Sequence, residues 1–185
     1  KENDMTTTIH PTRAKTTATK GVPMDSLRKT ALVAGVLYVI TFISIPTLIL
    51  YGPVLSDPNY IVGPGPDTAI IIGAILEVIV ALAGVGTAVA LYPVVKRQNE
   101  GVALGFVGSR TLEGAAIVAG VVSLLSLVTL RQAGVGANAA ATGQALVAQY
   151  NWFFLLGQSL MPVLNALLLG SQMYRSRLVP RVLPV

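Results

Sequence analysis

The chain has 185 residues, of which 53% are hydrophobic and 11% charged, and its formal net charge is +5. Soluble domains carry roughly 25% charged residues, so this composition excludes an ordinary water-soluble domain. The chain has no cysteine, which excludes disulfides, thiolate metal ligands and cysteine nucleophiles.

The amino-terminal residues 1–27 are predicted to be a disordered polar tail, because they are rich in Thr, Lys and Arg and cannot bury a core. Residues 30–51 are apolar and uncharged. This predicts a first membrane span, since about 20 helical residues cross a hydrocarbon core of about 30 Å. Asp25 or Ser26 is expected to cap its start, and Pro46 is expected to bend it.

Three more spans follow along the chain. Residues 56–67 are acidic and rich in Pro and Gly, which predicts a loop. The second span is predicted at 68–95, the third at 102–130 after the turn "KRQNEG", and the fourth at 148–174 after the Gly/Ala-rich loop "RQAGVGANAAATG", with a kink at Pro162. The predicted fold is an all-α integral membrane helical bundle with four transmembrane helices, occupying residues 28–178.

Basic residues flank the spans unevenly. They gather in the tail, in the 96–101 turn and at the carboxyl end, whereas the other loops carry Arg131 alone, beside Asp57 and Asp67. The positive-inside rule therefore predicts that both termini are cytoplasmic. The basic residues that flank the spans also account for the net positive charge of the chain. The predicted partner is therefore the lipid bilayer, and binding of nucleic acid is not predicted. The aromatic residues expected to mark the outer membrane interface are Tyr51, Tyr150, Trp152 and Phe153.

Three charged residues nevertheless lie inside the spans, namely Glu77, Arg110 and Glu113. A charge near the bilayer centre costs roughly 2.5–3.5 kcal/mol on insertion scales, so these side chains are expected to face protein or trapped water. Small residues share their helix faces, which lets helices approach closely. These residues are Gly73, Ala81, Gly84 and Ala88 around Glu77, and Gly105, Ser109, Ala116, Gly120 and Ser123 around Glu113.

Helical rise places Glu77 and Glu113 at similar depths and Arg110 one turn away, within reach of either glutamate. Asn165 falls near the depth of Arg110, in a stripe with Gln158 and Gln172 spaced by seven. The candidate polar cluster is therefore Glu77, Arg110, Glu113 and Asn165. Two interpretations remain open: small-molecule or ion transport, in one form coupled to protons, and a structural helix lock in a non-catalytic scaffold or partner-binding subunit.

An enzyme is not predicted, and neither is a catalytic, cofactor or metal site. No histidine or lysine lies in a span to activate Ser109 as a nucleophile. The Gly-rich stretches "GVGTAVA" and "GVGANAA" lack the preceding strand and the Lys-Ser/Thr of a phosphate loop. The single histidine, His10, lies in the tail, and Asp57 and Asp67 are interpreted as solvated loop charges.

Three stretches carry a family resemblance: "ALYPVVKRQNEGVALGFVGSRTLEGAAIV", "LLGQSLMPVLNALLLG" and "YRSRLVPRVLPV". They closely resemble a bacterial family of multi-pass membrane proteins known as domain of unknown function 4386, and the likeness covers Leu27 to Val185. The resemblance implies a bacterial cytoplasmic membrane protein with charged residues at the three intramembrane positions, and it implies no activity. Members usually continue beyond "PRVLP" into about two further spans, so residues 179–185 are expected to begin a truncated further segment. Four helices also offer few ways to enclose two polar faces, so this and the resemblance together predict missing downstream helices or a homo-oligomer.

Overall fold

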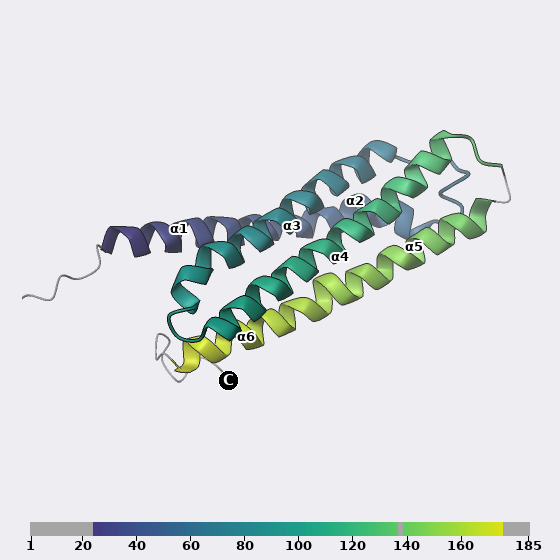
Figure 1. The fold of residues 1–185 in the computed structure, drawn as a ribbon. Coiled ribbons are helices and arrows are strands. Elements are labelled where there is room, and N and C mark those ends of the chain that lie inside the picture. The colour runs from purple at the N-terminus through teal and green to yellow at the C-terminus, as the bar shows by residue number, and fades with distance from the viewer. Residues whose placement is uncertain (1–23, 137–138, 176–185) are drawn as a thin grey trace, which may run out of the picture.

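The computed structural model describes residues 24–136 and 139–175, and these residues form four helical rods without a strand. The rods, in chain order, are α1 (Met24–Ile40) with the 3-10 helix η1 (Thr41–Ile43) and α2 (Ser44–Ser56); α3 (Asp67–Val95); α4 (Glu100–Gln132); and α5 (Ala140–Phe154) with the π-helix η3 (Leu155–Leu160) and α6 (Met161–Arg175) (Figure 1). All four are long and apolar enough to cross a membrane, which confirms the four predicted spans.

The boundaries differ from the predicted ones in three places. Helix α1 begins at Met24, so residues 24–27 are helical rather than disordered, and Asp25 and Ser26 lie inside the helix instead of capping it. The first rod continues to Ser56, because a membrane helix tolerates a proline such as Pro53. The fourth rod begins at Ala140 rather than 148, because alanine favours helix strongly enough to recruit the end of the predicted loop. The remaining predicted tail and residues 179–185 lie outside the described residues.

Both predicted proline bends coincide with a change of helix type. Proline has no N–H for the carbonyl four residues earlier and its ring crowds that carbonyl. Four residues before Pro46 the chain is in η1, and four residues before Pro162 it is in η3. Both interruptions therefore have a local covalent cause.

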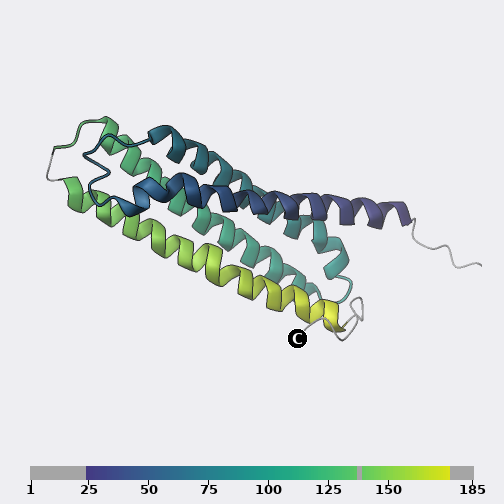
Figure 2. The ribbon, with the colours of Figure 1, turned by 180° about the vertical axis from the view of Figure 1, so that it is seen from behind.

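Helices α3 and α4 form an antiparallel pair, with the first rod packed on α3 and the fourth rod packed on α4 (Figures 1 and 2). The bundle has two ends: the loop end, which holds residues 57–66, and the turn end, which holds residues 96–99. At the turn end α1 and α6 diverge, as both views show. At the loop end the rods converge on the largest apolar core cluster, which includes Tyr51, Val54, Leu124, Leu127 and Tyr150.

Arg131, near the end of α4, fixes the 57–66 loop. Its Nε donates to the carbonyl of Gly63 at 2.7 Å, and its Nη1 donates to the carbonyl of Gly65 at 2.9 Å and pairs with Asp67. The guanidinium also lies 4.9 Å from the centroid of the Tyr60 ring, within the range of a cation–π contact. Asp67 is thus an ion-paired residue at the start of α3, not a freely solvated loop charge.

Candidate functional site

The small-residue faces predicted around the two intramembrane glutamates point into helix contacts. On α3 the whole set is buried, and Glu77 itself is 0% exposed. On α4, Ser109, Gly120 and Ser123 are buried, whereas Gly105 is exposed near the start of the helix. Periodicity therefore located the inward faces correctly over most of their length.

Glu77 joins three other segments of the bundle. Its Oε2 accepts a hydrogen bond from the hydroxyl of Tyr51 on α2 at 3.5 Å, and its Oε1 accepts from the hydroxyl of Tyr150 on α5 at 3.5 Å. Oε1 also accepts from Nε2 of Gln158 on η3 at 3.0 Å. We call Tyr51, Glu77, Tyr150 and Gln158 the Glu77 junction. All the donors are neutral and all lie on other helices, so the carboxylate fastens four segments together.

Glycines make room for both tyrosines of the Glu77 junction. A Cβ added at Gly73 would lie 2.5 Å from Cε1 of Tyr51, and one added at Gly120 would lie 3.3 Å from Cδ2 of Tyr150. The two rings meet edge to face with their centroids 5.5 Å apart. Tyr51 and Tyr150 are 0% and 2% exposed, so the expectation that they mark the outer membrane interface is wrong. The Tyr51 ring packs against Gly73 and the Tyr150 ring packs against Gly120 instead.

Arg110 pairs with Glu113 on its own helix. Its Nη1 donates to both carboxylate oxygens of Glu113, at 3.1 and 3.0 Å, and Asn165 on α6 donates to the same carboxylate. Within the described residues, no hydrogen bond or ion pair links Arg110 to Glu77. The four predicted site residues therefore divide into two groups: Glu77 with its tyrosines, and Arg110, Glu113 and Asn165.

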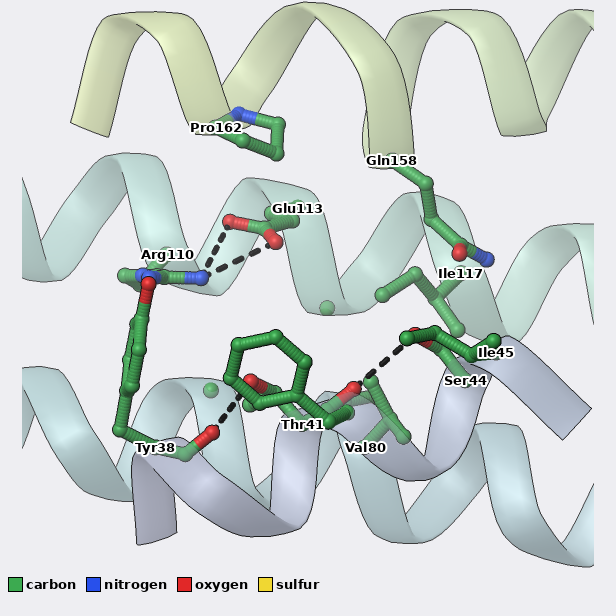
Figure 3. Close-up of a pocket in the computed structure, with 14 residues that line it drawn as sticks. Tyr38, Thr41, Ser44, Ile45, Val80, Arg110, Glu113, Ile117, Gln158 and Pro162 are labelled. Atoms are coloured by element: carbon green, nitrogen blue, oxygen red, sulfur yellow. Dashed lines mark hydrogen bonds and ion pairs between the residues drawn. The ribbon is translucent and has the colours of Figure 1, made fainter. Parts of the chain in front are cut away.

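Arg110 and Glu113 of the second group line a pocket of about 300 Å³ between the first rod, α3, α4 and the fourth rod (Figure 3). We call it the Arg110 pocket. Its polar lining comes from Tyr38, Thr41, Ser44, Arg110, Glu113 and Gln158, and apolar wall is supplied by Ile45, Val80, Ile117 and Pro162. The side chains of Arg110 and Glu113 are 13% and 12% exposed. The ion pair thus borders an open space instead of being enclosed between packed helices.

Several buried polar atoms on α4 and α6 have no hydrogen-bond partner among the described residues. They are Oγ of Ser109, Nε of Arg110, Oδ1 of Asn165 and Nε2 of Gln172. Asn165 and Gln172 are both 3% exposed and Gln158 is partly buried, so the predicted seven-residue stripe does face inward. Unpaired buried polar groups cost about 1–3 kcal/mol each, and the polar stripe therefore carries unused hydrogen-bonding capacity from the pocket toward the turn end.

Sequence reasoning missed Tyr51, Tyr150 and Gln158 as partners of Glu77. A signal was present, because a buried carboxylate needs donors, and no cation other than Arg110 lies within the predicted spans. The described residues contain no group of three or more His, Cys, Asp or Glu side chains that could hold a metal ion. Ser109 is buried without a hydrogen-bond partner in the same part of the chain.

Residues 33–185 match the family described as Domain of unknown function (DUF4386). No curated protein and no solved structure matches the chain. Because the match spans most of the sequence, the chain belongs to this family and is a multi-pass helical membrane protein.

Proposed function

We propose that this protein binds a small molecule or ion in the Arg110 pocket and transports it across a bacterial cytoplasmic membrane. The observation that carries the proposal is that the Arg110–Glu113 pair lines a pocket of about 300 Å³. Ionisable residues inside a membrane are expensive and usually face a cavity or a path. The pocket supplies both a charged donor and a charged acceptor for a solute.

The geometry of the pair argues against a helix lock at this site. Arg110 and Glu113 are three positions apart on one helix, so their attraction is satisfied wherever α4 lies. A lock that fixes which helices associate requires partners on different helices. Among the residues that the structure describes, the bond with Asn165 is the one hydrogen bond from Glu113 that reaches another helix.

The hydrogen-bonding capacity around the pair also suits a solute. Arg110, which lines the pocket, has a donor at Nε without a partner among the described residues. A bound solute with an acceptor group satisfies such an atom, whereas apolar packing leaves its desolvation uncompensated. The walls formed by Ile45, Val80 and Ile117 favour a solute that also has an apolar part.

Flux through liposomes tests the proposal directly. Protein is reconstituted into vesicles loaded with a pH-sensitive dye, and dissipation of an imposed pH gradient is followed with and without a panel of small amino acids, amines and carboxylates. Glu113→Gln is expected to abolish the flux that wild type supports, while Glu100→Gln retains it. Glu100 is the matched control because it lies on the same helix but at the exposed turn end, where it accepts a bond from Tyr92. Equal flux with Glu113→Gln and wild type contradicts the proposal.

Binding gives a second readout that does not require transport. A solute that binds only the folded protein stabilises it by about 2.7 kcal/mol at a concentration of 100 Kd. The same solute panel is therefore screened for an increase in thermal stability in detergent. Stabilisation is expected for wild type and Glu100→Gln, and is expected to be lost with Arg110→Gln.

A non-catalytic scaffold is the second candidate, and the Glu77 junction favours it. That junction ties α2, α3, α5 and η3 together through a fully buried carboxylate, as a structural lock would. A scaffold role predicts that wild type and Glu113→Gln both give the flux of protein-free liposomes, and that no solute stabilises the protein.

A further inference from the structure

A second pocket lies on the same side of the bundle as the Arg110 pocket, toward the loop end. It has a volume of about 290 Å³, and we call it the Asp57 pocket. Helix α2 and the fourth rod border both pockets: Ile45 and Gln158 line the Arg110 pocket, and Val54 and Asn151 line the Asp57 pocket. The two pockets therefore lie along one seam, between the first and fourth rods.

The Glu77 junction occupies the interval between the pockets. Ile45 and Val54 are nine positions apart on α2, which corresponds to about 14 Å along a helix, and Tyr51 lies between them. On the fourth rod, Tyr150 is adjacent to Asn151 in the Asp57 pocket, and Gln158 itself lines the Arg110 pocket. Each pocket thus ends at a residue of the junction or beside one.

Side chains, not backbone, close this interval. The two tyrosine rings meet edge to face at 5.5 Å, and their hydroxyls converge on Glu77 from opposite rods. Rotation of a side chain is fast and local compared with separation of packed helices. The contacts at this point are hydrogen bonds from neutral donors, which a polar solute replaces one at a time.

Gln158 belongs to the Glu77 junction and also lines the Arg110 pocket. Its Nε2 donates to Glu77, and its side chain lines the Arg110 pocket opposite the Arg110–Glu113 pair (Figure 3). A solute in that pocket with an acceptor group competes with Glu77 for the Gln158 amide. Occupancy of the pocket is thereby linked to the strength of the junction.

We propose that Tyr51, Glu77, Tyr150 and Gln158 form the closed barrier of a solute path that runs along the seam and joins the Arg110 pocket to the Asp57 pocket. This inference rests on the proposed transport function and locates its occluding element. The barrier separates access from the loop end and access from the turn end.

Cysteine accessibility tests the barrier without knowledge of the solute, because the chain has no cysteine of its own. Ser44→Cys places a thiol in the Arg110 pocket and Ala148→Cys places one in the Asp57 pocket. Each variant is labelled in right-side-out and in inverted membrane vesicles with a membrane-impermeant methanethiosulfonate. We expect Ala148→Cys to react from one face and Ser44→Cys only from the opposite face.

Changes at the junction are then combined with Ser44→Cys. Tyr51→Phe with Tyr150→Phe keeps both rings and removes both hydroxyls, and we expect the rate of labelling from the Ala148 face to rise about tenfold, equivalent to about 1.4 kcal/mol. Tyr150→Ala is expected to raise it further. Tyr174→Ala, an exposed position on α6, is the matched control and leaves the rate unchanged. Size-exclusion profiles establish that each variant is folded, and the double Phe variant serves if Tyr150→Ala is not.

Two results overturn the barrier: labelling of Ser44→Cys at equal rates from both faces in the otherwise unchanged protein, or an unchanged rate in the folded junction variants. Failure of the transport proposal has a different signature. If Glu113→Gln leaves flux unaltered while the junction variants open the path to the thiol reagent, the barrier is supported and the transport proposal is refuted.

Discussion

The Glu77 junction makes a quantitative prediction about stability. Glu77→Leu keeps the approximate volume of the side chain but removes the acceptor for three donors, the hydroxyls of Tyr51 and Tyr150 and the amide of Gln158. Hydrogen bonds between membrane helices are worth about 0.6 kcal/mol on average and about 1.7 kcal/mol at most. Loss of three gives an expected destabilisation of about 2–5 kcal/mol.

Two companion variants separate loss of hydrogen bonds from change of shape. Glu77→Gln retains a carbonyl oxygen in place of one carboxylate oxygen, and a tyrosine hydroxyl can accept from the new amide, so we expect it to cost less than about 1 kcal/mol. Glu77→Leu combined with Tyr51→Phe, Tyr150→Phe and Gln158→Leu removes acceptor and donors together. Replacing both partners by apolar groups of similar shape is close to neutral, so this combination is expected to recover part of the loss.

Unfolding is measured by titration with sodium dodecyl sulfate in mixed micelles, with circular dichroism and tryptophan fluorescence as probes. Trp152 is the only tryptophan in the chain and lies on α5 two positions from Tyr150, so its emission reports on the junction. The reasoning is refuted if Glu77→Leu unfolds at the same detergent fraction as wild type, or if the combined variant is less stable than Glu77→Leu alone.

Three further predictions concern other parts of the molecule. A reporter active only in the cytoplasm is expected to be active when fused after Gly101 or Arg177 and silent after Gly136, since basic residues flank the first two positions; the opposite pattern contradicts cytoplasmic termini. Gly157→Ala places a Cβ 2.8 Å from Cβ of Ala116 and is expected to cost about 1–3 kcal/mol, whereas Gly170→Ala meets open space and costs nothing; equal unfolding midpoints for the two variants exclude close packing of η3 on α4. Burial, and then the nearby Asp67 carboxylate, raise the pKa of Tyr60 above its usual value of 10.0. The unfolded chain therefore loses this proton first as pH rises above about 10, and the stability of the fold decreases over that range. Subtracting the phenolate titration of Tyr60→Phe from that of wild type should show that Tyr60 ionises at a higher pH than a free tyrosine. Ionisation of Tyr60 at the usual pKa contradicts its buried position.

The sequence predicted the features that depend on one helix at a time. Span positions follow from the length of apolar runs, and the inward faces of Glu77 and Glu113 follow from helical periodicity, because both are set by local geometry. The inward stripe of Gln158, Asn165 and Gln172 is a result of the same kind. Proline positions likewise predicted both interruptions of the helices.

Features that depend on two or more helices were not predictable from one sequence. Whether Arg110 pairs with Glu77 or with Glu113 depends on how α3 and α4 are rotated about their axes and shifted along them relative to each other. Tyr51 and Tyr150 lie near the predicted ends of their spans, where aromatic residues commonly mark the interface. Only the continuation of α2 to Ser56 and the early start of α5 at Ala140 move the two tyrosines inside the bundle.

The two glutamates differ in where their partners come from, and this difference constrains how the molecule can move. The cation that pairs with Glu113 is on the same helix, so the Arg110–Glu113 pair stays neutral when α4 shifts relative to its neighbours. The donors to Glu77 are on other rods, so separating those rods breaks bonds at a cost of about 2–5 kcal/mol by the values above. That cost is comparable to the coupling free energies of about 1–3 kcal/mol that connect ligand sites to conformational change. In the proposed transport function, a solute that binds beside Glu113 and competes for Gln158 therefore acts on the contacts that hold the rods together, while the Arg110–Glu113 pair keeps its own bonds.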